Sequence, residues 1–284
     1  MIRVYAITKK KLYSGDIASS KKLDDLSREA DWLWIDCLNL DEKEIITISN
    51  FFEIETKTLK ETGNEKKYPS CERYKDSVLI SIPFAKFGKT IQVPISLMVK
   101  DKTLVTLRDE NSTTLVRRIV ETLENYLMEN GKIHPSFVVS RLFREVANEN
   151  SKVMMNIKKQ IDKVEEEALE RPRDKSVTRS VLKLKKEVFA LHRLLWFEKE
   201  LMSDVKECVV PHIKLSEESK LILEDAIDDI QRELEFEDSY SRTLDGILRL
   251  QDLGLIHRVE RTLIYLTILI ILLDIMLIVL EVMK

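Results

Sequence analysis

Short runs of β-branched and aromatic residues, separated by polar residues, mark the first part of the chain. Such runs predict β-strands, because side chains alternate between the two faces of a sheet. Asp41 followed by Glu44 predicts a helix start, and Leu and Ile at helical spacing predict another helix over 113–130. We expect strands over 32–36, 76–83, 95–99 and 103–107. These elements predict an α/β or α+β globular domain over 1–135.

From about residue 136 the hydrophobic period becomes helical almost without interruption. Two helices are predicted over 137–169 and from 174 to about 208, with a break at Arg171-Pro172-Arg173. A third helix is expected to begin after Ser216, which could cap it, and to run on for about 65 residues, or about 100 Å. A helix of that length is typical of a bundle stalk or a coiled coil. We therefore expect a helical bundle and stalk over 136–258.

Leu263 to Val282 is a run of 20 residues, of which 15 are Leu, Ile or Val. As a helix it would be about 30 Å long, which matches the hydrocarbon core of a bilayer. On an insertion scale these side chains contribute about −5 to −9 kcal/mol, against about +3 kcal/mol for Asp274. The run predicts a transmembrane helix over 259–284. The alternative is a helix buried in the core of a soluble oligomer.

Flanking charges predict how such a helix would be oriented. His257, Arg258 and Arg261 precede the run, and Lys284 follows it. Because the more positive side stays in the cytoplasm, the bulk of the chain is expected there. The first residues contain no apolar stretch of the length of a secretory signal. The sequence thus predicts a cell-membrane protein with a cytoplasmic N-terminal domain.

Acidic and hydroxyl side chains recur every seven residues along this segment, at Glu260, Thr267, Asp274 and Glu281. Seven residues are nearly two helical turns, so the four lie in one stripe. In a ring of helices the stripe could line a pore, and carboxylate rings suit cations. Alternatively, Asp274 stabilises an oligomer and Glu281 reaches out to the membrane surface.

A second acidic group precedes the apolar run. Asp225 and Asp229 share a helix face, with Asp228 beside them. Oxygen ligands of this kind suit Mg²⁺ and Ca²⁺, so the three are candidate metal ligands, for a regulatory or a transported Mg²⁺. The alternative is an acidic face that is simply hydrated.

The overall composition excludes several classes of protein. There are 46 Lys and Arg against 49 Asp and Glu, for a net charge of −3, which is not the basic balance of a nucleic-acid binder. Six Gly and six Pro are too few for a sandwich of many short strands. The three cysteines are too far apart in sequence for a disulfide framework or a local metal site. We see no nucleophile-and-base pattern and no phosphate-binding loop, so we do not expect an enzyme.

One stretch, over 163–196, runs from an acidic helix end through LERP to LLW, and four others lie at 33–45, 53–82, 96–109 and 259–267. Together they resemble the CorA family of divalent-cation transporters, and the first of them is the most specific. The resemblance implies a cytoplasmic α/β domain, a long stalk helix that continues into a C-terminal transmembrane helix, and a homopentamer with a central pore. It further implies transport of Mg²⁺, or of Co²⁺, Ni²⁺ or Zn²⁺.

The family carries a Gly-Met-Asn loop and a second membrane helix after the first one. No Gly-Met-Asn tripeptide occurs in this sequence, and we expect a divergent or truncated member. Two functions follow from these patterns. One is a homo-oligomeric channel for a divalent cation. The other is a non-conducting, membrane-anchored scaffold or metal sensor that assembles through its stalk.

Overall fold

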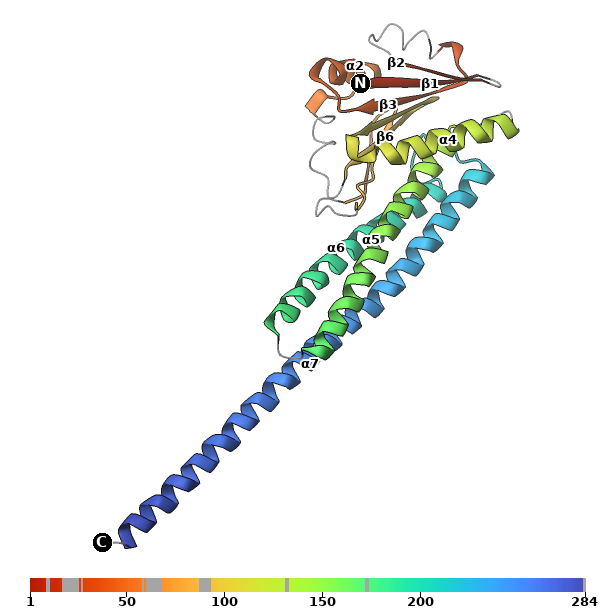
Figure 1. Cartoon of the computed structure of the whole chain (residues 1–284). Helices are drawn as coiled ribbons and strands as arrows, with labels where there is room; N and C mark the ends of the chain where they lie inside the picture. The colour runs from red at the N-terminus through yellow and green to blue at the C-terminus, as the bar shows by residue number, and fades with distance from the viewer. Residues whose placement is uncertain are drawn as a thin grey trace. The chain divides into compact units, whose positions relative to one another are not determined.

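The structure is a computed structural model that describes residues 1–8, 11–16, 26, 28–57, 59, 68–86, 93–130, 133–171 and 174–282 (Figure 1). The chain forms two compact units. The first contains Met1–Asn156 and Phe189–Phe236, and the second contains Ile157–Val188 and Glu237–Lys284. The domain boundaries expected from the sequence, at 135 and 258, stay a prediction.

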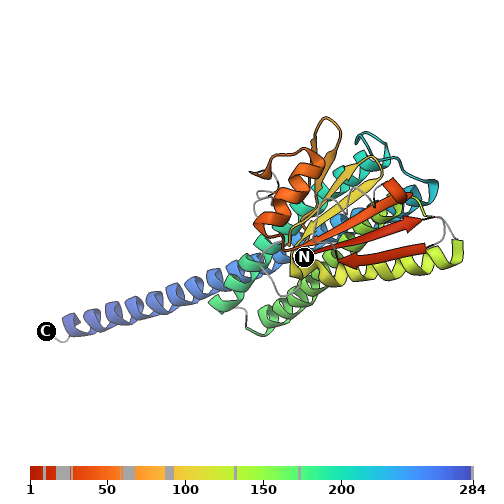
Figure 2. The same ribbon diagram turned by 90° about the horizontal axis from the view of Figure 1, so that it is seen from above.

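A seven-stranded sheet forms the N-terminal part of the first unit (Figure 2). Its order is β2-β1-β3-β7-β6-β5-β4; β3 and β7 are parallel, and all other neighbours are antiparallel. The strands are β1 (Ile2–Thr8), β2 (Lys11–Asp16), β3 (Trp32–Leu38), β4 (Ser70–Arg73), β5 (Val78–Ser81), β6 (Ile95–Lys100) and β7 (Thr103–Arg108). The four predicted strands correspond to β3, β5, β6 and β7.

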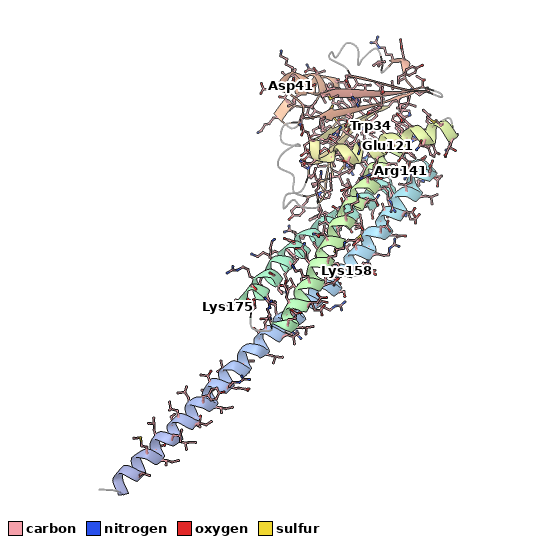
Figure 3. All side chains as sticks on the ribbon, viewed as in Figure 1. Trp34, Asp41, Glu121, Arg141, Lys158 and Lys175 are labelled. Carbon is pink, nitrogen blue, oxygen red and sulfur yellow. The ribbon has the colours of Figure 1, made fainter. Side chains whose placement is uncertain are left out.

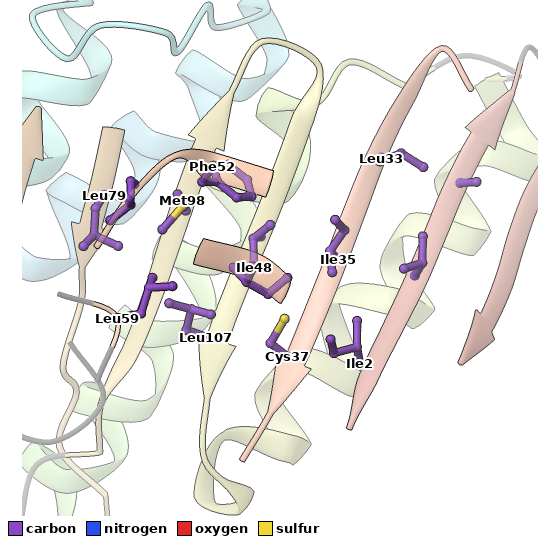
Figure 4. Packing of buried hydrophobic residues seen from close by; sticks show 14 of the residues in the cluster. Ile2, Leu33, Ile35, Cys37, Ile48, Phe52, Leu59, Leu79, Met98 and Leu107 are labelled. Carbon is purple, nitrogen blue, oxygen red and sulfur yellow. The ribbon is translucent and has the colours of Figure 1, made fainter. Parts of the chain in front are cut away.

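Helix α2 (Glu42–Phe52) covers one face of this sheet (Figure 4). Its buried Ile48 and Phe52 pack against Ile35, Met98 and other apolar side chains that point to the same face of the strands. The predicted start of the helix is confirmed: Asp41 Oδ1 accepts from the Glu44 backbone N–H at 2.8 Å, and Glu44 Oε2 accepts from the Asp41 N–H at 3.0 Å. This reciprocal capping satisfies two N–H groups that the helix leaves without partners.

The other helices are long. They are α4 (Thr113–Asn130), α5 (Ser136–Glu170), α6 (Lys175–Lys206) and α7 (Glu217–Val282), with a short 3₁₀ turn over Glu110–Ser112. Ser216 caps α7, as expected, because its Oγ accepts from the Ser219 N–H at 3.2 Å. Of the predicted break after α5, Pro172 and Arg173 lie outside the described residues.

Within the first unit, ion pairs join α4 to α5. Arg118 of α4 donates to Glu145 at 2.6 Å and to Glu149 at 2.7 Å, both on α5. Burial alone would raise the pKa of Glu149, but hydrogen bonds from Lys152 and Arg118 outweigh it and lower that pKa. The ionised Glu149 side chain therefore helps to hold α5 against α4.

The second unit packs the end of α5, the first half of α6 and the second part of α7. Its core consists of apolar side chains spaced at three and four residues, and Lys185 pairs with Asp245 at 2.5 Å. Over the residues that the structure describes, no helix has a segment both long and apolar enough to cross a membrane. The buried side chains of this core are Ile157, Ile161, Val164, Ala168, Val177, Val181, Leu184, Val188, Leu244 and Ile247.

Candidate functional site

The three candidate metal ligands on α7 have different surroundings. Asp225 and Asp228 are exposed, while Asp229 is half-buried. Asp229 accepts from Arg144 of α5 and also from Arg232, one turn further along α7. Two guanidinium groups thus neutralise Asp229, and its contact with Arg144 holds α5 and α7 together.

This pairing changes the expected role of the acidic group. In one copy of the chain, no group of three or more His, Cys, Asp or Glu side chains among the described residues could hold a metal ion. The exposed Asp225 and Asp228 lie three residues apart on one face of α7, where they are accessible to solvent or to another copy. A metal ion at these two side chains stays a prediction.

The predicted stripe lies on the second part of α7. Glu260, Thr267 and Asp274 are exposed, and the side chain of Glu281 is outside what the structure describes. Thr267 Oγ1 donates to the Leu263 carbonyl at 2.9 Å, so its lone pairs remain accessible. Since one continuous helix carries all four residues, their seven-residue spacing places them along one side of its surface.

Apolar side chains around the same part of α7 are exposed in the single chain (Figure 3). Every large one from Leu263 to Met276 is between 49% and 64% exposed, on all sides of the helix. A contiguous apolar surface of this kind marks an interaction with protein or lipid. A single chain therefore does not provide the apolar surroundings that the side chains of this described part of α7 require.

A hollow of about 570 Å³ lies in the first unit, beside the β6–β7 turn and the start of α5. Asp31 and Asp101 line it together with Lys102 and Lys214, so its formal charges balance. Its remaining lining includes Trp32 and the exposed rings of His134 and His212. The balanced charges give this hollow no preference for a cation or an anion.

Glu198 of α6 is a buried acidic residue that the sequence patterns did not predict. Its side chain is completely buried, and among the residues that the structure describes it accepts one hydrogen bond, from Asn150 of α5 at 2.7 Å. Burial raises the pKa of Glu198 to about 8, although the bond from Asn150 works in the opposite direction. The sequence contained a pattern that could have revealed it, because Glu198 lies at helical spacing from the apolar Leu191, Leu194 and Met202, all three of which are buried.

The chain is similar to known proteins both in sequence and in fold. The profile of the family described as "CorA-like Mg2+ transporter protein" matches residues 29–275. The chain is also similar to the cobalt/magnesium transport protein CorA of Methanocaldococcus jannaschii, with 24% identity over 216 residues, 74% of this chain and 65% of that protein. It therefore spans slightly less than two thirds of that relative's length.

Two solved structures share the fold. The complete structure of the CorA magnesium transporter from M. jannaschii superposes with a TM-score of 0.76 at 17% identity, covering 94% of this chain and 81% of that one. The cytoplasmic domain of ZntB from Vibrio parahaemolyticus gives 0.64 at 11% identity, covering 89% and 96%. The expected α/β domain with long helices is confirmed by these likenesses.

Proposed function

Because the chain belongs to the CorA-like Mg²⁺ transporter family, we propose that it assembles into a homo-oligomeric membrane channel for a divalent metal cation. The family is one of transporters, which confirms the expectation that the chain is not an enzyme. Mg²⁺ is the first candidate ion and Co²⁺ the second, since the curated relative is named for both. Ni²⁺ and Zn²⁺ are further candidates from the sequence resemblance.

The observation that carries this proposal is the exposed apolar surface of α7 from Leu263 to Met276. In water such a surface costs about 25 cal/mol for each Å², and a bilayer or a ring of identical helices would cover it. We propose that the stretch over 263–282 spans the cell membrane, with the N-terminal domain in the cytoplasm.

The stripe of Glu260, Thr267, Asp274 and Glu281 is proposed to face the axis of the assembly. A carboxylate exposed to lipid is unfavourable, whereas one that lines a water-filled path attracts cations. Mg²⁺ gives up its bound water reluctantly, so the ion would meet these rings with part of its hydration shell. A homopentamer, as the resemblance implies, would repeat each ring five times.

A regulatory role is proposed for the acidic face of the stalk. Asp225 and Asp228 are exposed and have no ion pair among the described contacts, so a Mg²⁺ ion bound between copies could draw them together. Asp229 is proposed to act mainly through its contact with Arg144. Carboxylates of neighbouring copies repel each other, and a bound cation would remove that repulsion.

The second candidate is a non-conducting, membrane-anchored scaffold or metal sensor. The exposed Asp225 and Asp228 favour it, because a metal-binding stalk needs no conducting path. Both candidates use the same fold and the same assembly. They differ in whether ions cross the membrane.

Metal uptake into proteoliposomes distinguishes the two. The full-length chain is compared with Asp274→Asn and with Asp252→Asn, which makes the same change at an exposed site of α7 that precedes the apolar stretch. A channel predicts uptake by the parent, reduced several-fold by Asp274→Asn and unchanged by Asp252→Asn. Absence of uptake by the parent rejects transport and favours the sensor. Equal uptake by all three proteins rejects the pore-lining role of Asp274.

A further inference from the structure

We propose that Glu198 is a buried proton-binding site, which ties the segment after β5 to helices α5 and α6 and loosens that segment when the carboxyl group ionises. The inference is independent of the proposed transport function. It rests on three groups from distant parts of the first unit: the backbone of Ala85, the side chain of Asn150 and the carboxyl group of Glu198.

Hydrogen bonds connect these groups in a line. The Ala85 backbone N–H donates to Asn150 Oδ1 at 2.7 Å, and Asn150 Nδ2 donates to Glu198 Oε2 at 2.7 Å. Asn150 is 1% exposed and Glu198 is 0% exposed. One amide side chain therefore connects the backbone after β5 to a carboxyl group on α6.

The geometry fixes where a proton must be. A backbone N–H can only donate, so the oxygen of Asn150 must face Ala85 and its NH₂ group must face Glu198. Glu198 Oε2 is thus an acceptor, and a proton on the carboxyl group belongs to Oε1. That atom is buried and has no hydrogen-bond partner among the described residues.

An ionised Glu198 would be poorly stabilised here. A buried carboxylate normally has a cationic partner or several donors, whereas the described residues offer Glu198 a single neutral donor, Asn150. The protonated form leaves one O–H without a partner, which costs about 1–3 kcal/mol, whereas an uncompensated buried charge costs more. The rise of the pKa of Glu198 to about 8, through burial, has the same cause.

The charged side chains described on the neighbouring segments have partners other than Glu198. No ion pair joins Glu198 to any of the residues that the structure describes. On helix α6 itself, the guanidinium group of Arg193 stacks on the Tyr68 ring. The ammonium group of Lys199 donates to the amide oxygen of Gln231. The other contacts are Glu149 with Arg118 and Lys152, Lys86 with the Asn111 carbonyl, and Glu233 with Ser151.

Ionisation therefore requires water to reach the carboxylate. Water that enters competes for the amide of Asn150, and the Ala85 N–H then loses its protected acceptor. The bridge between Phe84 and Val93 is adjacent to this N–H, so the segment over 82–86 and its pairing beside β6 should loosen together. The folded domain would thus respond to alkaline pH through Glu198, which forms no ion pair with the residues that the structure describes.

Hydrogen exchange of the full-length protein tests the proposal. Protection of the Ala85 amide, corrected for the intrinsic pH dependence of exchange, is measured at about pH 7 and about pH 9. The wild type should lose about tenfold in protection. Glu198→Gln, which cannot ionise, should lose none. Glu200→Gln, at an exposed site of the same helix, should behave as the wild type does.

The proposal is wrong if wild-type protection is equal at both pH values, or if Glu198→Gln loses as much as the wild type. Should the Gln variant fail to fold, Glu198→Met takes its place, since it removes both oxygens at similar volume. A protein with Met at this site that still loses protection at alkaline pH would equally overturn the assignment.

Discussion

Arg108 binds both carboxylate oxygens of Asp36, with Nε at 2.8 Å from Oδ1 and Nη2 at 2.7 Å from Oδ2. The two side chains are 7% and 4% exposed and join the parallel strands β7 and β3. Thr106 Oγ1 also donates to Asp36 Oδ1, at 2.7 Å, and accepts from Trp34 Nε1 at 3.3 Å. A buried pair of this kind leaves an uncompensated charge if either partner is removed.

Arg108→Met should therefore lower the free energy of unfolding by about 3–5 kcal/mol. Removing both charges, with Asp36→Leu added, should cost less than the single change. Denaturant unfolding followed by tryptophan fluorescence measures both variants. Arg3→Met is the matched control: its pair with Asp16 is exposed, so the change should cost about 1 kcal/mol or less. A double variant less stable than the single one would contradict this account.

Mg²⁺ protection against proteolysis should depend on Asp225 and Asp228. Replacing both by Ala should abolish the extra protection that Mg²⁺ gives, while digestion without the ion stays at the parent rate. Asp229→Ala should instead speed digestion with or without Mg²⁺, because it leaves Arg144 without its carboxylate partner. Asp238→Ala, an exposed acid on the same helix, is the control. If the double variant keeps full Mg²⁺ protection, these two residues do not bind the ion.

Ionisation of Glu198 should lower the stability of the folded chain as the pH rises from 4.5 to about 8. Its pKa is raised from 4.5 to about 8 by burial, so in that interval the folded chain holds a proton that the unfolded chain releases. The unfolding equilibrium constant should increase by at most about tenfold per pH unit there and level off above it. Glu198→Gln should remove this slope, as judged by denaturant midpoints across the range. A slope unchanged in that variant would belong to other groups.

Membrane association should depend on the apolar surface of α7. Ile271→Lys places a charge in the middle of the stretch, which costs about 3 kcal/mol of insertion energy. The fraction of full-length chain that sediments with liposomes should therefore fall. Leu221→Lys makes the same change at an exposed position of α7 outside the stretch and should have no such effect. Equal loss in both variants would point to misfolding instead of insertion.

The helix starts could be predicted from the sequence, because each depends on hydrogen bonds between residues close together in the chain. Asp41 and Ser216 were identified as helix starts because caps depend on residues within one turn. Three strands were not predicted. β2 and β4 are short and largely polar sheet edges, and β1 is buried on both faces, so it lacks an alternating pattern.

The candidate site was harder to predict, since it depends on contacts between distant residues. The side chain of Asp229 is of a type that binds metal ions, but it pairs with Arg144, which is 85 residues away in the sequence. Glu198 and Asn150 are 48 residues apart, and Ala85 is a further 65 from Asn150. No sequence window contains such a pair. The seven-residue stripe, by contrast, is a property of one helix and could be identified from its spacing alone.

The one parallel pairing in the sheet has a consequence for how the chain folds. The hairpin of β1 and β2 with β3 can form from neighbouring residues, and so can the meander of β4 to β7. The two halves meet along a single seam between β3 and β7, whose bonded partners Asp36 and Thr106 are 70 residues apart. Long-range closure of that kind is slow. The buried Asp36–Arg108 pair sits on the seam, so it should form late and mark the step at which the two halves become one domain.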